Sequence, residues 1–328
     1  MISQAAKKAD RAENIEFELA LEQTKSLMDS SLLKAPIIIR SYTAHLAQVK
    51  GKFIRAVSVL SCAQDNDGEV HPNAMKLAAA IEILHLATLV HDDVIDNAKT
   101  RRGIPTLHKK YGKRTAVICG DYLLCLALKI SSSVENREDY MNLDVPQYMG
   151  RICLGELNQH INNGNLNLSV YNYLKIIAGK TASLFEASFY GGAILCPNAK
   201  DYSHLYQKLG RSIGMIFQLS DDCIDFEDSQ ELAKKPVQSD YEQGVITLPL
   251  IHALHENEDF KEKASKQGVS RSEINSVVRA TGGLDFTRMV SKRYYNRAVK
   301  IMDKLSLTDD KRKKLTAILD KAYNGLKK

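Results

Sequence analysis

Asp92-Asp93-Val94-Ile95-Asp96 and Asp221-Asp222-Cys223-Ile224-Asp225 are two copies of one acidic pattern, D-D-x-x-D, and each ends an apolar run with helical periodicity. An unpaired carboxylate is costly to bury, so aspartates on apolar helices need cations. The first and last Asp of each copy are four residues apart and face the same side of a helix. Two such faces turned towards each other would suit Mg²⁺, which prefers few carboxylates together with substrate phosphates.

The chain around these motifs is predicted to be mainly α-helical. Proline is scarce, with 7 in 328 residues, and Ala, Leu and Ile form long runs. Helical patterns cover about residues 73–96, 170–193 and 202–226, and no segment alternates with period two long enough to indicate a sheet. Since no low-complexity linker divides the sequence, we expect one large all-α domain over residues 1–328, with about residues 1–12 as a candidate disordered end.

The composition disfavours several classes of protein. No run of about 18 uninterrupted apolar residues is present, so no transmembrane segment is expected. The first dozen residues lack the apolar core of a secretion signal, and the six cysteines form no C-x-x-C pair. The net charge of +6 is spread along the chain, which favours a solvated surface over nucleic-acid binding. These features predict a cytoplasmic protein with no nucleic-acid partner.

Basic and polar residues accompany each acidic motif. His85 precedes Asp92 by about two helical turns and shares its face, and Arg101-Arg102-Gly103 follows the first motif after a short loop. The two arginines could merely neutralise the aspartates, or they could clamp phosphate oxygens, and both alternatives stay open. Gln218 lies three residues before Asp221, on the same helix face.

Two further basic groups are weak signals by themselves. Gly179-Lys180-Thr181 interrupts a helical pattern and could contact phosphate, but it lacks the upstream glycine spacing of a P-loop. Lys52 and Arg55 lie on one side of a predicted helix start, where surface residues are more common than site residues. Only the combination of these groups with the acidic motifs predicts a site.

That combination is specific in its order. The chain reads K-x-x-R, E-x-x-H, DDxxD, RRG, GKT, F-Q-x-x-DDxxD and G-x-x-T-L-P over about residues 40–255. This set resembles the trans-isoprenyl (polyprenyl) diphosphate synthase family, in particular the catalytic subunits of heptaprenyl and hexaprenyl diphosphate synthases. The resemblance implies an all-α bundle of the isoprenoid synthase type, in which the two aspartate motifs face each other across a central cavity. It also implies a homodimer, or a chain that works with a second, small subunit.

The resemblance further implies an activity and a set of roles. Such an enzyme condenses isopentenyl diphosphate head to tail with an allylic diphosphate, and about three Mg²⁺ per active site stabilise the departing diphosphate. The Mg²⁺ ligands would be Asp92, Asp96 and Asp221, with Asp93, Asp222 and Asp225 as ligands or partners of ligands. The allylic diphosphate would be bound by Arg101, Lys180, Thr181 and Gln218. Isopentenyl diphosphate would be bound by Lys52, Arg55, His85 and Arg102. The catalytic set would be Asp92, Asp96, Asp221, Lys180 and Arg101.

Two segments depart from the family's usual pattern. G-G-K-R-x-R-P reads Lys50-Gly51-Lys52-Phe53-Ile54-Arg55-Ala56 here, so one Gly, one Arg and the Pro are lost. Many members have Lys where this chain has Val245, which removes one expected contact with the allylic phosphate. Lys234 or Lys235, in a resembling K-P segment, could replace that contact.

Small residues before the first motif predict the product length. Ala87 and Thr88 lie about one turn before Asp92, where farnesyl-making relatives commonly have bulky aromatic residues. Small side chains would leave a channel open for a medium or long all-trans product, by analogy hexaprenyl to octaprenyl diphosphate. The alternative reading of both residues is ordinary helix packing.

Three other functions remain as alternatives. A short-chain farnesyl or geranylgeranyl diphosphate synthase would share the motifs but stop elongation earlier. A class I terpene cyclase also uses DDxxD and Mg²⁺, but it needs no second diphosphate site. The chain could also be a subunit that is inactive without its partner.

Overall fold

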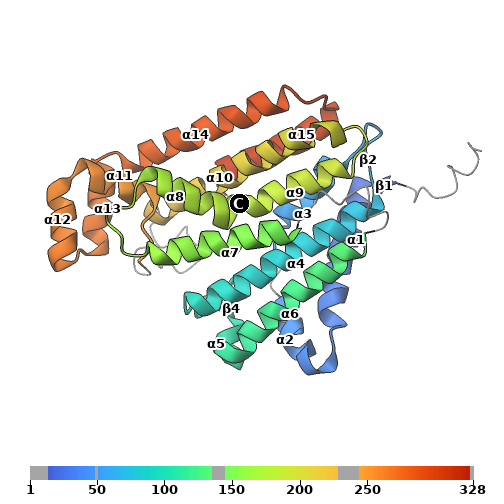
Figure 1. Cartoon of the computed structure of the whole chain (residues 1–328), viewed down its shortest axis with the longest axis horizontal. Helices are drawn as coiled ribbons and strands as arrows, with labels where there is room; N and C mark the ends of the chain where they lie inside the picture. Colours follow the sequence, from blue (N-terminus) through green and yellow to red (C-terminus); the bar gives the residue numbers. More distant parts are fainter. Residues whose placement is uncertain (1–13, 49–50, 135–144, 228–243, 326–328) are drawn as a thin grey trace, which may run out of the picture.

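Helices account for nearly all of the regular structure (Figure 1). The computed structural model describes residues 14–48, 51–134, 145–227 and 244–325. Its helices are α1 Phe17–Leu33, α2 Ile37–Ala47, α3 Ile54–Ala63, α4 Pro72–Ile95, α5 Leu107–Tyr111, α6 Lys113–Ser132, α7 Val145–Ile161, α8 Val170–Ile177, η3 Ala178–Ala182, α9 Ser183–Ile194, η4 Lys200–Tyr202, α10 Ser203–Glu227, α11 Leu248–Glu256, α12 Glu258–Gln267, α13 Arg271–Ala280, α14 Gly283–Met302 and α15 Asp309–Tyr323.

The only strands in the described residues are two short antiparallel pairs. β1 (Ile15–Glu16) pairs with β2 (Glu69–Val70), and β3 (Thr100–Arg101) pairs with β4 (Ile104–Pro105). The prediction of an all-α protein is therefore confirmed. The expected disorder of residues 1–12 concerns a segment outside the described residues.

Helix α4 brings the first acidic motif to one end of the core. It begins at Pro72, which fits the first helical position because its missing N–H would be unpaired there. The Nδ1 atom of His71 accepts a hydrogen bond from the N–H of Asn73 at 3.1 Å and caps the helix. The helix then packs against α1, α3, α6 and α9 and is buried on most sides. The motif occupies the last turn of α4, as the sequence predicted.

Helix α10 carries the second motif in the same way. It packs on α9, α14 and α15. An added Cβ at Gly210 would lie 2.6 Å from the carbonyl oxygen of Phe185, and one at Gly214 would lie 2.6 Å from Cα of Ala182. These glycines therefore let α10 approach η3 and α9 closely.

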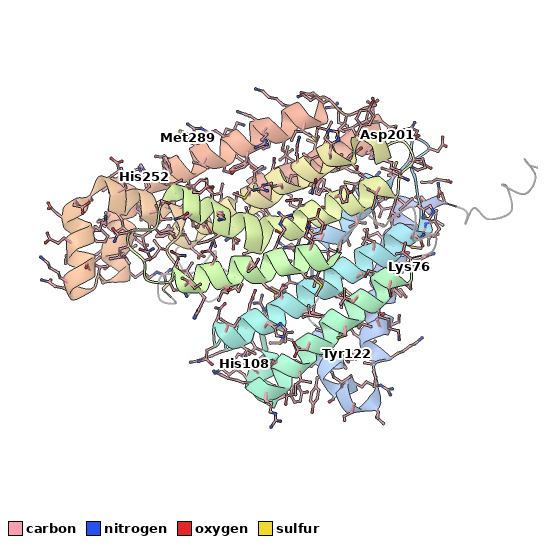
Figure 2. The ribbon with its side chains drawn as sticks, in the orientation of Figure 1. Lys76, His108, Tyr122, Asp201, His252 and Met289 are labelled. Carbon is pink, nitrogen blue, oxygen red and sulfur yellow. The ribbon has the colours of Figure 1, made fainter. Side chains whose placement is uncertain are left out.

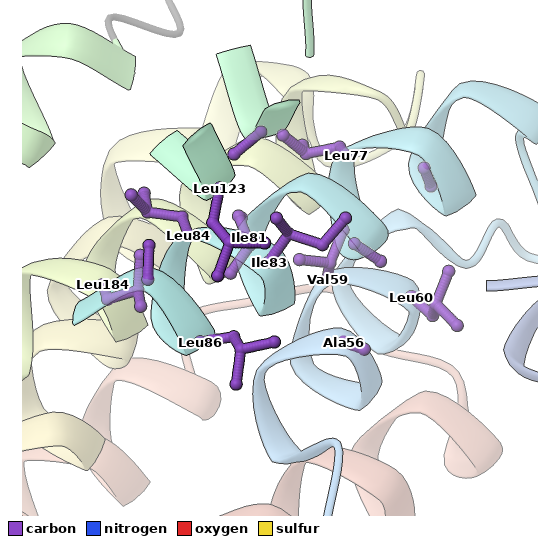
Figure 3. Packing of buried hydrophobic residues seen from close by; sticks show 14 of the residues in the cluster. Ala56, Val59, Leu60, Leu77, Ile81, Ile83, Leu84, Leu86, Leu123 and Leu184 are labelled. Carbon is purple, nitrogen blue, oxygen red and sulfur yellow. The ribbon is translucent and has the colours of Figure 1, made fainter. Parts of the chain in front are cut away.

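The apolar core has three clusters that hold these helices in place. The first surrounds α4 and includes the fully buried Leu77, Ile83 and Leu123 (Figure 3). The second joins α9, α10, α14 and α15, and the third lies among α8, α10, α11 and α13. Together the clusters fix the C-terminal ends of α4 and α10, where the acidic motifs lie.

Within the described residues, two helices, α4 and α6, reach the length and apolar composition of a membrane span. A core helix of a bundle passes the same test, and 67% of the apolar window of α4 is buried inside the protein. Only 28% of the corresponding window of α6 is buried, so α6 presents an apolar face outwards. A cytoplasmic location stays a prediction.

Candidate active site

The middle aspartate of the first motif is buried and already paired. Both carboxylate oxygens of Asp93 accept hydrogen bonds from Nε of Arg101 at 2.9 Å, and Nη2 of Arg101 donates to Oδ1 at 2.8 Å. Such a bidentate pair fixes the guanidinium plane. Asp92 is half-buried and Asp96 is exposed one turn later, so these two carboxylates face the accessible side. Asp93 is therefore paired inside the protein, whereas Asp92 and Asp96 are accessible and could bind a cation.

A tight hairpin returns the two arginines to the end of α4. Arg102 and Gly103 form its turn and have φ values of 50° and 83°, as a type I′ hairpin requires. The hydroxyl of Thr106 donates to the carbonyl oxygen of Ala98 at 2.7 Å and closes the loop. Arg101 thus reaches Asp93 from a strand, not from the helix.

The middle aspartate of the second motif is also buried and paired, with different partners. Asp222 is buried and accepts hydrogen bonds from the hydroxyl of Tyr173 and, at 2.9 Å, from Nε2 of Gln218. The hydroxyl of Thr181 donates to Oε1 of Gln218 at 2.7 Å. The amide of Gln218 is therefore oriented from both sides. Asp221 and Asp225 are half-buried and lie four residues apart on α10.

A π-helical turn, η3, connects the two motifs. It widens the helix between α8 and α9 and places Lys180 and Thr181 next to each other, as single π-turns at functional sites often do. Lys180 acts electrostatically on Asp92 and Asp96 of the first motif, whereas Thr181 bonds Gln218 beside the second. The interruption that the sequence showed at Gly179 is this turn.

Helix α7 supplies a carboxylate that the sequence analysis missed. Oε2 of Glu156 lies 2.8 Å from Nζ of Lys180. Burial works against the charge of Lys180, but Glu156 and Asp92 outweigh it and raise the pKa of the ammonium group. Glu156 stands in a run that reads as an ordinary amphipathic helix, so no local signal in the sequence distinguishes it.

The carboxylates of the first motif lack sufficient positive charge around them. Burial raises the pKa of Asp92 to about 7; Lys180 opposes this shift, and Glu156 and Asp96 add to it. Burial also raises the pKa of Asp96. A divalent cation would remove this penalty, so the donor set fits a metal ion.

No ready-made metal cluster exists in the part of the chain that the structure describes. In residues 14–48, 51–134, 145–227 and 244–325, no three His, Cys, Asp or Glu side chains come together in a grouping that could hold a metal ion. Mg²⁺ commonly takes only one or two carboxylates and completes its shell with water and phosphate oxygens. Asp92 and Asp96 at the end of α4, and Asp221 and Asp225 on α10, each form a pair of carboxylates four residues apart, which suits that mode of binding.

A second cationic group lies deeper, where α3 meets α4. The buried guanidinium of Arg55 lies 4.7 Å from the ring centre of Phe185, and burial lowers its pKa to about 10, with Glu82 acting in the opposite direction. His85 is close enough to Arg55, Arg101 and Arg102 that burial and these three charges lower its pKa well below the ordinary value. The imidazole is therefore neutral at pH 7.

The remaining predicted residues are placed as follows. Lys52 is exposed just before α3, and an added Cβ on the adjacent Gly51 would lie 3.4 Å from Nη1 of Arg102. Val245 is half-buried ahead of α11. Lys234 and Lys235 lie outside the described residues. The structure thus brings the segment before α3 next to the arginine hairpin.

Comparison with known proteins identifies the family. The polyprenyl synthetase family model matches residues 37–281, which is more than half of the chain. The chain belongs to the polyprenyl synthetase family. It is therefore a prenyltransferase, and its closely similar solved relatives give it the isoprenoid synthase fold.

Individual relatives of this polyprenyl synthetase agree with the family assignment. Heptaprenyl diphosphate synthase component 2 of Geobacillus stearothermophilus is 33% identical over 273 residues, 81% of this chain and 83% of the relative. The crystal structure of heptaprenyl diphosphate synthase from Staphylococcus aureus superimposes with a TM-score of 0.85 at 29% identity, covering 95% of this chain and 99% of that one. A polyprenyl synthase from Caulobacter crescentus, solved with calcium and isoprenyl diphosphate, has a TM-score of 0.84 at 27% identity, covering 94% and 95%.

The bare backbone at Gly155 lets α7 approach the π-helical turn. An added Cβ there would lie 2.3 Å from the backbone nitrogen of Lys180. Gly155→Ala should therefore displace Lys180 from Glu156 and Asp92 and lower kcat/KM of the synthetase by about 100-fold, the loss that a misplacement of about 1 Å can cause.

The matched control is Gly150→Ala on the same helix, where the added methyl group meets nothing within 4 Å. It should retain the wild-type kcat/KM. Steady-state kinetics and thermal melting of both variants make the comparison. Wild-type kinetics of the Gly155 variant would show that the contact does not position Lys180.

Proposed function

We propose that this polyprenyl synthetase condenses isopentenyl diphosphate head to tail with an allylic diphosphate and makes a medium- or long-chain all-trans polyprenyl diphosphate. The observation that supports the proposal is the presence of two neighbouring cationic groups, one beside the first acidic motif and one around His85, with Arg101 acting on both. Lys180 and Arg101 border the accessible aspartates, and Arg55 and Arg102 surround the neutral His85. Two diphosphates in one site require two such groups.

The metal would be Mg²⁺, about three ions per active site, bound through the outer aspartates of each motif together with diphosphate oxygens. Bound Mg²⁺ would neutralise the charge that develops on the departing diphosphate. The ligands would be Asp92, Asp96, Asp221 and Asp225. The middle aspartates would act differently: Asp93 holds Arg101, and Asp222 holds Gln218.

On the allylic side, three groups would contact the diphosphate. Lys180 would exchange Glu156 for a phosphate oxygen, and Arg101 would keep its bidentate contact with Asp93 while its remaining N–H groups face the substrate. Gln218 has one amide N–H left after its bond to Asp222. Thr181 would hold that amide in place.

On the isopentenyl side, arginine and lysine would supply positive charge for the diphosphate, and a histidine would orient it through a hydrogen bond. Arg55, Arg102 and Lys52 would bind the diphosphate electrostatically. His85 is neutral among these cations, so it would donate a hydrogen bond without adding to their mutual repulsion.

The chemical sequence follows from this placement. Cleavage of the allylic C–O bond leaves an allylic cation and diphosphate, and the apolar walls exclude water from the cation. The alkene of isopentenyl diphosphate attacks the cation and forms the new C–C bond. The resulting cation loses a proton to the departed diphosphate, which restores the double bond. A terpene cyclase would have no use for the group around His85, which favours the synthase.

The growing chain would extend from the metal site along α4. Thr88 lies one turn before Asp92 on the same face and is half-buried, and its hydroxyl is bonded to the carbonyl oxygen of His85 at 2.8 Å. Ala87 is fully buried in the cluster that contains Leu123. Both residues are small, so the tail would pass Thr88 and push into the apolar side chains near Ala87.

The exposed apolar face of α6 would be covered by a second copy of the chain. Ile118, Cys125 and Leu128 are exposed at spacings typical of a helix–helix seam, and the exposed fraction of Ile118 is 57%. Helix α7 adds exposed apolar residues at Leu154 and Ile161. One helix face can meet its own copy across a two-fold axis, so it suits a homodimer. A small second subunit is the alternative occupant.

Product analysis tests the proposed reaction directly. Purified protein is supplied with farnesyl diphosphate, isopentenyl diphosphate and Mg²⁺. Chromatography should then detect products from hexaprenyl to octaprenyl diphosphate, and chelation of the metal should abolish them.

Asp92→Asn should lower kcat by about 100-fold or more because the metal loses a ligand. Products that stop at farnesyl or geranylgeranyl diphosphate would overturn the chain length, and product formation without isopentenyl diphosphate would overturn the reaction.

Enlarging the small residues of α4 should shorten the product. A phenyl ring in Thr88→Phe or Ala87→Phe would block the path of the tail, so elongation should stop at least one isoprene unit earlier. Chromatography of the product and thermal melting are measured together, since overpacking at Ala87 also costs stability, roughly 1–3 kcal/mol. An unchanged product distribution in both folded variants would show that the tail takes another path.

A charge placed on the exposed apolar face of α6 should dissociate the proposed dimer. Ile118→Asp buries a carboxylate in an apolar interface and should convert the protein to monomers in light scattering. Met289→Asp is the matched control, because Met289 is an exposed apolar residue on α14, far from Tyr122 of α6 in Figure 2. It should leave the mass unchanged. A monomeric wild type would favour the two-subunit alternative instead.

A further inference from the structure

Helix α3, which carries Arg55, begins without a cap of its own. Its N-cap residue, Phe53, has left-handed backbone angles, φ 51° and ψ 32°, and makes no side-chain cap hydrogen bond. The first N–H groups of a helix have no partner inside the helix, and leaving them buried and unpaired is costly. The start of α3 therefore depends on a partner from elsewhere.

Glu82 of α4 is that partner. Its Oε1 accepts a hydrogen bond from the backbone N–H of Ala56 at 2.9 Å, across 26 residues of sequence. Burial of the carboxylate raises its pKa, and the charges of Arg55 and Arg102 oppose this shift, as do hydrogen bonds from the backbone N–H groups of Ala56 and Arg55. A carboxylate at a helix N-terminus is favourable by itself, and the two guanidinium groups add to this.

The guanidinium of Arg55 has few other constraints. It lies against the ring of Phe185, and its buried Nε has no hydrogen-bond partner within the described residues. Its position is consequently set by the first turn of α3 and by the charge of Glu82. An unpaired buried donor at this point is available to an incoming anion.

We infer that Glu82 is a positioning residue for the diphosphate of isopentenyl diphosphate. It caps α3 through Ala56 and thereby fixes Arg55, and its charge allows Arg55, His85 and Arg102 to assemble before the substrate arrives. The inference rests on the proposed function, because it assigns a support to the second diphosphate site. Glu82 itself does not touch the substrate.

Kinetics with both substrates varied separately test this role. Glu82→Ala should raise KM for isopentenyl diphosphate by about tenfold or more, whereas kcat and KM for the allylic substrate should change by less than about twofold. Glu82→Gln keeps an oxygen that can accept the bond from Ala56, so its KM should rise less. If Glu82→Ala fails to fold, the KM of Glu82→Gln for isopentenyl diphosphate tests the role instead.

The control is a second buried glutamate with an arginine partner. Glu186 receives hydrogen bonds at 2.8 Å from both terminal nitrogens of Arg151, outside the proposed substrate sites. Glu186→Gln should lower the melting temperature and leave KM for isopentenyl diphosphate unchanged. This comparison separates positioning from general loss of stability.

A double-mutant cycle shows whether Glu82 acts through Arg55. In an Arg55→Ala background, Glu82→Ala should raise KM further by less than about twofold, because the group that it positions is gone. Fully additive effects, or equal increases in KM for both substrates, would overturn the inference. If the wild type itself makes no product from the two substrates, the proposed function fails; if the wild type is active and Glu82→Ala keeps its KM, only the positioning role fails.

Discussion

The cost of burying a carboxylate organises this site. Each acidic motif ends a helix of the bundle, so its middle aspartate turns inwards and must be paired inside the protein. Asp93 is paired with Arg101, and Asp222 with Tyr173 and Gln218. The outer aspartates Asp92, Asp96, Asp221 and Asp225 are half-buried or exposed, so they are more accessible than the middle ones. One sequence pattern therefore yields two kinds of carboxylate. The buried middle aspartates orient Arg101 and Gln218, which lie next to the more accessible aspartates.

The same pairing explains how groups beside the two motifs are held next to each other. They lie on different helices, and the π-helical turn between α8 and α9 connects them because it holds Lys180 and Thr181 side by side. This turn is fixed by backbone contact on both sides, with Gly155 of α7 and Gly214 of α10 against it. A side chain larger than glycine at these positions would displace the turn, and with it the ammonium group of Lys180 that acts on Asp92.

The sequence was sufficient for the helices, the class of fold and the two accessible carboxylate faces, since these depend on local periodicity and spacing. It left open whether the arginines after the first motif neutralise aspartate or bind phosphate, and the structure pairs Arg101 with Asp93. It missed Glu156 and Tyr173, and it gave no role to Glu82 although E-x-x-H begins there. Each of these meets its partner on another helix, and that partner cannot be read from local spacing.

The segment from Lys50 to Ala56 departs from the family's usual sequence, and one of its changes allows a new hydrogen bond. Where the resembling family usually has proline, this chain has Ala56, and proline has no N–H to donate. The hydrogen bond from Ala56 to Glu82 therefore exists only because the proline is absent. Proline would have stiffened the start of α3 by itself, whereas alanine adds a second backbone hydrogen bond to Glu82, beside the one from the N–H of Arg55. The rigidity that Arg55 needs is thus supplied by a contact between helices instead of by the covalent ring.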